Sequence, residues 1–188
     1  MKILNLNFQE QRIPLYGPGS KEEILKHSPA GKVPCLLDGS TTVWDSLAIL
    51  EYLAEKHPQL WPSDREERAR ARSICAEMHS GFPSLRSHMS MNVRKRYPGK
   101  GRTPEVLLEV DRIKSIWEKA KGPFLFGSFT AADAMYAPVV LRFRTYGVEL
   151  PAASRAYADA VLALPAMHEW IAAAERETES IAKFELYE

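Results

Sequence analysis

The chain has 188 residues, of which 45% are hydrophobic and 26% are charged, and its formal net charge at pH 7 is +1. This composition is typical of a soluble globular protein with enough apolar residues for one large or two small domains. The low net charge predicts no long-range field for nucleic acid or an anionic membrane, and no apolar stretch approaches the roughly 20 residues of a membrane span.

The cysteines and histidines predict neither disulfides nor a metal site. Cys35 and Cys75 lie far apart and form no CxxC pair, which favours a reduced, cytoplasmic setting. The N-terminal residues become polar too early for a secretory signal. The histidines show no metal-site spacing such as HExxH.

The first part of the chain predicts the order β-α-β-β-α. A strand is expected over residues 7–16, and a short helix over 20–28 with Ser20 and Glu23 as its capping box. A hairpin is expected over residues 32–44, followed by a helix that begins at Asp45 or Ser46 and ends at Pro58.

The rest of the chain predicts helices only, with the domain boundary at Trp61-Pro62-Ser63. Ser63-x-x-Glu66 is a second capping box, and it opens a long helix that Gly81 and Pro83 bend. The later helices are expected to begin at Thr103-Pro104, to run from Thr130 to Gly147, and to form a pair divided at Pro165.

Two features of the hairpin suggest a ligand site. A cis bond before Pro34 would turn the N–H and C=O of Val33 outward, where they could pair with a peptide ligand. An ordinary edge-strand proline is the alternative. Asp45 and Ser46 offer a carboxylate, a hydroxyl and free helix N–H groups, which together fit the ammonium and carboxylate of an α-amino acid. Simple N-capping explains the same pair.

The segment SPAGKVPCLLDGSTTVWDSLAILEYLAE (28–55) resembles the glutathione-binding segment of the cytosolic glutathione transferases. FGSFTAADAMYAPVV (126–140) resembles that family's second signature, in which Thr130 and Asp133 cap a buried helix. The resemblance implies a thioredoxin-like α/β domain over residues 1–62 and an all-helical domain over 63–188. It also implies glutathione as co-substrate, and a homodimer.

The resemblance assigns a glutathione site in which Val33, beside a cis Pro34, pairs with the cysteinyl backbone. Asp45 and Ser46 hold the γ-glutamyl group, and Lys32 reaches the glycine carboxylate, for which a solvated lysine is the equal alternative. By the same resemblance, the region around the first bend of the helical domain faces the electrophile, which implies an electrophile site of His79, Phe82, Arg86 and Met89. A helix packed into its own domain explains Phe82 and the methionine equally well.

The chain departs from the family at its N-terminus. Residues 4–16 match the family's second strand after the last turn of its first helix, so about 20 residues of strand and helix are expected to be absent. The thiol-activating Ser, Tyr or Cys of the family lies in that helix. No catalytic residue is therefore assigned, since Tyr16, Ser20 and Cys35 lie in other elements. A truncated gene, a missing segment and a natural variant remain open as explanations.

The basic segment RKRYPGKGR (94–102) could suggest nucleic-acid binding, but its glycines and proline and the low net charge favour a solvated loop. The sequence therefore predicts a protein similar to glutathione transferases, in which the glutathione thiolate attacks an electrophilic carbon. The alternative is a glutathione-binding or protein-interaction module without chemistry.

Overall fold

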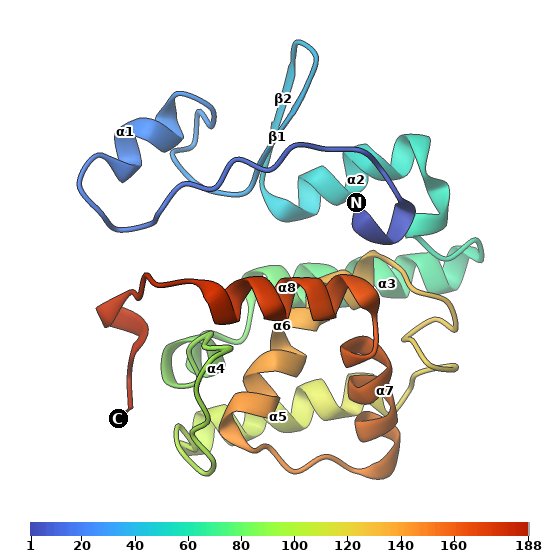
Figure 1. Cartoon of the computed structure of the whole chain (residues 1–188). Coiled ribbons are helices and arrows are strands. Elements are labelled where there is room, and N and C mark those ends of the chain that lie inside the picture. Colours follow the sequence, from blue (N-terminus) through green and yellow to red (C-terminus); the bar gives the residue numbers. More distant parts are fainter. Residues whose placement is uncertain (188) are drawn as a thin grey trace. The chain divides into compact units, whose positions relative to one another are not determined.

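The structure, a computed structural model, describes residues 1–187 and consists of two compact units (Figure 1). The first unit spans Met1–Leu60, and the second begins at Trp61. No helix in the described part of the chain is long and apolar enough to cross a membrane.

The first unit is built around one β-hairpin. Strand β1 (Cys35–Asp38) pairs antiparallel with β2 (Thr41–Trp44), with Cys35 opposite Trp44 and Asp38 opposite Thr41. Gly39 takes a φ of 59° in the two-residue turn, a conformation that glycine adopts without strain. Helix α2 (Ser46–Lys56) packs against the hairpin, and the 3₁₀ turn η2 (Pro58–Leu60) follows. The predicted hairpin and its following helix are confirmed.

The strand predicted over residues 7–16 is wrong. The chain forms a 3₁₀ turn η1 (Lys2–Leu4) and then runs without regular structure until the helix α1 (Ser20–Leu25). A strand needs a hydrogen-bonded partner, and the sheet of the described residues contains only β1 and β2. The first unit therefore has the order α-β-β-α instead of β-α-β-β-α.

Two predicted N-caps are also wrong, each by one residue. Gly19, with a φ of 74°, caps α1, while the Ser20 hydroxyl accepts a hydrogen bond from Gly17 N at 3.0 Å. Asp64 caps the first long helix in place of Ser63, because its Oδ1 accepts from the N–H of Glu67 at 2.9 Å. When a neighbouring residue can also act as the N-cap, the helix begins one residue earlier or later, and the rest of the helix forms as predicted.

The named elements of the second unit are all helices or 3₁₀ turns, as predicted (Figure 1). The bend at Gly81 separates two helices, Thr103 and Pro104 open the next one, and Pro165 divides the last two. The elements are α3 (Arg65–Ser80), α4 (Pro83–His88), α5 (Pro104–Trp117), α6 (Ala131–Tyr146), α7 (Ala152–Leu162), α8 (Pro165–Arg176) and the 3₁₀ turn η3 (Ala182–Phe184).

Helix α6 forms the centre of this unit, and most of its residues are buried. It packs against α3 and α7, and α5 also packs against α7. The Trp117 ring lies between aromatic neighbours, with centroids 5.1 Å from Phe143 and 5.0 Å from Tyr157. The Tyr136 hydroxyl donates to Ile74 O at 3.2 Å, which ties α6 to α3 through the core. Such an aromatic core gives the unit a stable framework.

Candidate ligand-binding site

The residues assigned to glutathione lie at one end of the hairpin. Lys32, Val33 and Pro34 precede β1, and Asp45 and Ser46 follow β2. The register pairs Cys35 with Trp44, so the two segments leave the sheet side by side, at the end opposite the Gly39 turn. Paired antiparallel strands lie about 5 Å apart. The hairpin therefore brings together residues that are more than ten positions apart in sequence.

The peptide bond between Val33 and Pro34 is cis, as predicted. Val33 is 48% exposed. Within the described residues its backbone N–H and C=O have no hydrogen-bond partner. An extended ligand backbone can pair with such free groups in the manner of an added strand.

Asp45 has a backbone conformation that is rare for a residue with a side chain, with φ 74° and ψ 130°. Its Oδ1 accepts from Leu47 N at 2.9 Å and from Ala48 N at 3.4 Å, so the residue does cap α2. Capping alone does not require a positive φ, since the usual N-cap backbone is extended. A strained residue at a helix start is a feature that clusters at ligand sites.

Ser46 is the first residue of α2 and is half-buried. Its hydroxyl makes no hydrogen bond to any other residue that the structure describes. A first-turn N–H has no partner inside the helix, and the dipole makes this end positive. The hydroxyl and the helix end can thus receive a carboxylate beside the Asp45 side chain.

Lys32 is exposed and makes no ion pair within the part of the chain that is described. Its exposure fits both a contact to a ligand carboxylate and a solvated lysine. Cys35, which like Cys75 is not in a disulfide, is half-buried and donates its S–H to His27 O at 3.3 Å. The Ser20 hydroxyl accepts from Gly17 N, and Tyr16 is largely exposed. No thiol-activating role is assigned to any of these three.

Three of the four residues assigned to the electrophile take part in packing or local bonding. Met89 is fully buried, Phe82 is nearly so, and the Arg86 guanidinium donates to Met78 O and to Gly81 O, the latter at 3.1 Å. His79 is exposed at the end of α3. The role of all four residues at an electrophile site stays a prediction.

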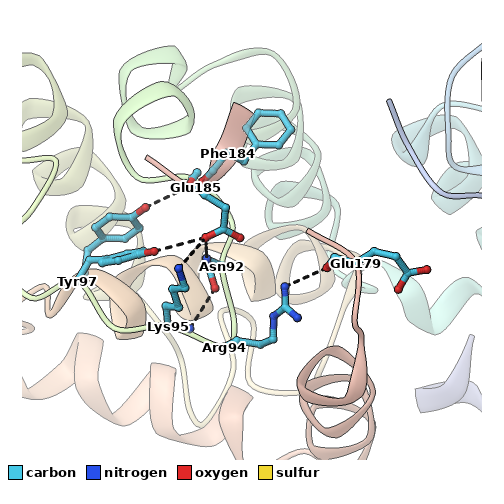
Figure 2. A network of polar contacts seen from close by, with 9 residues as sticks. Asn92, Arg94, Lys95, Tyr97, Glu179, Phe184 and Glu185 are labelled. Carbon is cyan, nitrogen blue, oxygen red and sulfur yellow. Dashed lines mark hydrogen bonds and ion pairs between the residues drawn. The ribbon is translucent and has the colours of Figure 1, made fainter. Parts of the chain in front are cut away.

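The basic segment predicted as a solvated loop is largely exposed, and the C-terminal residues contact part of it (Figure 2). Tyr97 is buried, and the Glu185 carboxylate accepts from Asn92 Nδ2 at 2.9 Å and lies 3.5 Å from Lys95 Nζ. Arg94 donates to the backbone carbonyl of Glu179 at 3.0 Å. The acidic and aromatic residues near the C-terminus could have predicted these contacts with the basic segment, but the overall composition does not reveal them.

The described residues contain no group of three or more His, Cys, Asp or Glu side chains placed to hold a metal ion.

Comparisons with known proteins agree with the fold. Residues 1–56 match the family model of the glutathione S-transferase N-terminal domain, and residues 68–173 match that of the C-terminal domain. A probable maleylacetoacetate isomerase from Caenorhabditis elegans is 24% identical over 157 residues, covering 80% of this chain and 73% of that protein. A maleylacetoacetate isomerase from Rattus norvegicus is 30% identical over 141 residues, and the match covers 71% of this chain and 64% of the rat protein.

Among solved structures, a glutathione transferase homolog from Burkholderia with bound glutathione superimposes with a TM-score of 0.69. The match covers 92% of this chain and 85% of that one at 24% identity, a level that shows the fold. The two units accordingly correspond to a thioredoxin-like N-terminal domain and a helical C-terminal domain. The chain belongs to the glutathione S-transferase family.

Proposed function

We propose that the chain binds glutathione at the open end of the hairpin and joins it, through its sulfur, to an electrophilic carbon of a small molecule. The observation that carries the proposal is the register of β1 and β2. It supports the proposal because it pairs Cys35 with Trp44, so that the exposed Val33 shortly precedes one strand and the strained Asp45 and the Ser46 hydroxyl directly follow the other. Backbone groups, a carboxylate and a helix N-terminus together match the peptide, ammonium and carboxylate of the tripeptide.

The proposed reaction is nucleophilic attack by the glutathione thiolate. A new S–C bond forms while the leaving group departs with its electron pair, and the thiol proton goes to solvent. A free thiol with a pKa near 8.5 is only about 3% thiolate at pH 7, so rate enhancement depends on stabilising the thiolate. His79, Phe82, Arg86 and Met89 remain proposed neighbours of the electrophile.

Isomerisation is a second candidate, because two of the relatives are named as maleylacetoacetate isomerases. In such chemistry the thiolate adds to one carbon of a conjugated double bond. The resulting single bond rotates, and elimination restores the double bond and frees the glutathione. The same glutathione site would serve both reactions. Binding without chemistry is the third candidate, favoured by the lack of an assigned thiol-activating residue.

Calorimetric titration of glutathione into wild type and Ser46→Ala tests the site. Loss of a hydrogen bond to a charged group costs about 1.5–3 kcal/mol, so the variant should bind about 10- to 100-fold more weakly. Ser40→Ala is the matched control, because Ser40 lies exposed in the turn at the other end of the hairpin. Equal affinity of Ser46→Ala and wild type would refute the site.

Rates with a chloronitrobenzene and with a cis-olefinic diacid then separate the candidates. Transfer predicts the aryl thioether, isomerisation predicts the trans diacid with glutathione unconsumed, and binding alone predicts the uncatalysed rate for both. If the midpoint of the pH profile lies below the pKa of the free glutathione thiol, the protein stabilises the thiolate. Tyr16, Ser20 and Cys35 are the residues to replace in that case.

Three further expectations belong to this proposal. Residues 1–62 form the glutathione-binding domain and 63–188 the helical domain. The protein is a homodimer, which light scattering on the eluted protein measures directly. Its setting is the cytoplasm, in keeping with two cysteines that are not in a disulfide.

A further inference from the structure

The end of the described chain lies against a surface formed by the segment 88–97, which includes the end of α4 and the loop after it (Figure 2). Residues 177–187, here called the C-terminal tail, contain no regular structure apart from the 3₁₀ turn η3. The hydrogen bonds between tail and segment join residues that are 83 to 99 positions apart in the sequence. The tail therefore contacts this surface as a short linear peptide would.

Bonds to α6 fix the loop without help from the tail. Tyr97 N donates to Thr145 O at 2.7 Å, and the Thr145 hydroxyl donates to Asn92 O at 2.6 Å. Asn92 Oδ1 also accepts from Lys95 N at 3.1 Å, which closes a turn within the loop. Tyr97, Asn92 and Thr145 are all buried. A binding surface that is fixed in advance loses little conformational entropy when a ligand docks.

Two buried tyrosines of this surface contact the aromatic ring of Tyr187 in the tail. The ring centroids of Tyr97 and Tyr146 lie 5.8 Å apart. The Tyr187 ring packs edge-on against both, with centroid distances of 5.6 Å to Tyr97 and 5.9 Å to Tyr146. Its hydroxyl donates to His88 O at 2.8 Å. Because the last carbonyls of a helix have no donor within the helix, Tyr187 supplies one to the end of α4.

The same surface recognises a carboxylate and a backbone carbonyl of the tail. The Glu185 carboxylate accepts from Asn92 Nδ2 at 2.9 Å and lies 3.5 Å from Lys95 Nζ (Figure 2). The hydroxyl of the buried Ser90 donates to Phe184 O at 2.6 Å. A carbonyl, a carboxylate and a hydroxyphenyl ring, all within four residues of chain, thus each have a specific partner on the surface.

The charges of the tail and of this surface are opposite. Residues 177–187 contain three glutamates and one lysine, whereas residues 88–97 contain two arginines, one lysine and no carboxylate. Complementary charge raises the rate of association and disfavours partners of the wrong sign. A ligand that fits this surface is therefore acidic as well as aromatic.

We propose that the segment 88–97, together with Tyr146, is a peptide-binding site for acidic segments with a glutamate two positions before a tyrosine. The chain's own tail occupies the site, and a segment of the same chemistry in a partner protein competes with it. Chain ends with little regular structure open locally at a low cost in free energy, so the tail can be displaced. The site is separate from the residues assigned to glutathione, and its occupation does not require transferase activity.

The test titrates the full chain with an amidated synthetic peptide of residues 181–187, IAKFELY, and follows amide NMR shifts, which should map to residues 88–97. A docked tail lowers the apparent affinity for the peptide by the fraction of chains whose site is open. Tyr187→Ala removes the ring contacts of the tail, so this variant should bind the peptide at least about tenfold more tightly than wild type. Leu186→Ala is the matched control, because Leu186 is 38% exposed, and it should bind as wild type does.

Two further measurements test the chemistry of recognition. A peptide with alanine in place of Glu185 should bind the Tyr187→Ala chain about tenfold more weakly than the parent peptide, because it lacks the charged hydrogen bond to Asn92. The chain variant Glu185→Ala opens the site by a second route that leaves the tyrosine rings in place. It should also bind the parent peptide more tightly than wild type.

Three outcomes overturn the proposal. These are equal affinity of wild type and both tail variants, undiminished binding of the alanine peptide, and no shifts at residues 88–97 of the tail variants at millimolar peptide. A titration of the same samples with glutathione is independent of these results. Its failure refutes the proposed function alone, because the peptide titration does not use glutathione.

Discussion

Asp133 and Thr130 hold the start of α6 in a reciprocal pair of contacts. Asp133 Oδ2 accepts from the backbone N–H of Thr130 at 2.8 Å and from its Oγ1 hydroxyl at 3.0 Å. The other oxygen of the same carboxylate accepts from Leu125 N at 3.0 Å. Both residues are buried, so these donors have no access to water. The capping box predicted from the sequence is confirmed, and it also anchors the loop before the helix.

Asp133→Ala should lower the free energy of unfolding by about 2–4 kcal/mol. The substitution leaves buried N–H and O–H donors without an acceptor, and each such loss costs about 1–3 kcal/mol. Denaturant titration measures the change. Asp111→Ala is the control, since this exposed α5 carboxylate makes one ion pair, 3.5 Å from Lys114, and should cost under about 0.5 kcal/mol. Similar denaturation midpoints for the two variants would contradict the structural role of Asp133.

Tyr52→Phe should raise the pKa of Asp38. The Tyr52 hydroxyl donates to Asp38 Oδ2 at 2.8 Å, and this hydrogen bond, together with the Lys56 charge, holds the Asp38 pKa below its usual value. Because the folded pKa is lowered, the contribution to stability is present above the unfolded value and is lost as pH falls through the folded one. Carbon-13 NMR titration of the Asp38 carboxyl measures the shift. Lys56→Gln should raise the pKa by a smaller amount.

Glu185→Ala should loosen the C-terminal tail without unfolding the helices. The carboxylate contacts Asn92, Lys95 and, at 3.5 Å, the Tyr97 hydroxyl (Figure 2). Faster amide hydrogen exchange is expected over residues 180–187, with a loss of about 0.5–1.5 kcal/mol in the free energy of unfolding. Glu179→Ala is the control, because Glu179 accepts from Arg94 through its backbone carbonyl, which the substitution retains. Unaltered exchange in Glu185→Ala would show that the carboxylate does not hold the tail.

The elements predicted correctly are those whose signals are local. Helix α6 has a capping box at its start and Gly147, with a φ of 61°, at its end, so its limits follow from neighbouring residues alone. The strand over residues 7–16 failed because a strand depends on a partner that the local sequence does not specify. The caps at Ser20 and Ser63 failed because Gly19 and Asp64 stand beside them and serve the same purpose.

The candidate site likewise contains features with local sequence signals, which were predicted, and contacts between distant parts of the chain, which were not. The hairpin was predictable because a two-residue turn fixes its register, in which Cys35 lies opposite Trp44. The structural bonds of Arg86 were not predicted, since they depend on how α3 and α4 meet at Gly81.

Asp45→Asn should separate the two roles that one side chain has at the start of α2. Asparagine keeps an oxygen that can accept from Leu47 N and tolerates a positive φ, so the free energy of unfolding should change by less than about 0.5 kcal/mol. The negative charge is lost. If the carboxylate pairs with the ammonium of glutathione, affinity should fall about 10- to 100-fold.

The matched control is Asp64→Asn at the start of α3. Asp64 Oδ1 accepts from Glu67 N at the same 2.9 Å, so this substitution makes the same chemical change to a helix cap outside the hairpin. It should leave glutathione affinity unaltered, with a similarly small change in stability. Calorimetry and denaturant titration on both variants give the two readouts. If Asp45→Asn binds glutathione as tightly as Asp64→Asn does, Asp45 is only a cap, and the ammonium must be held elsewhere.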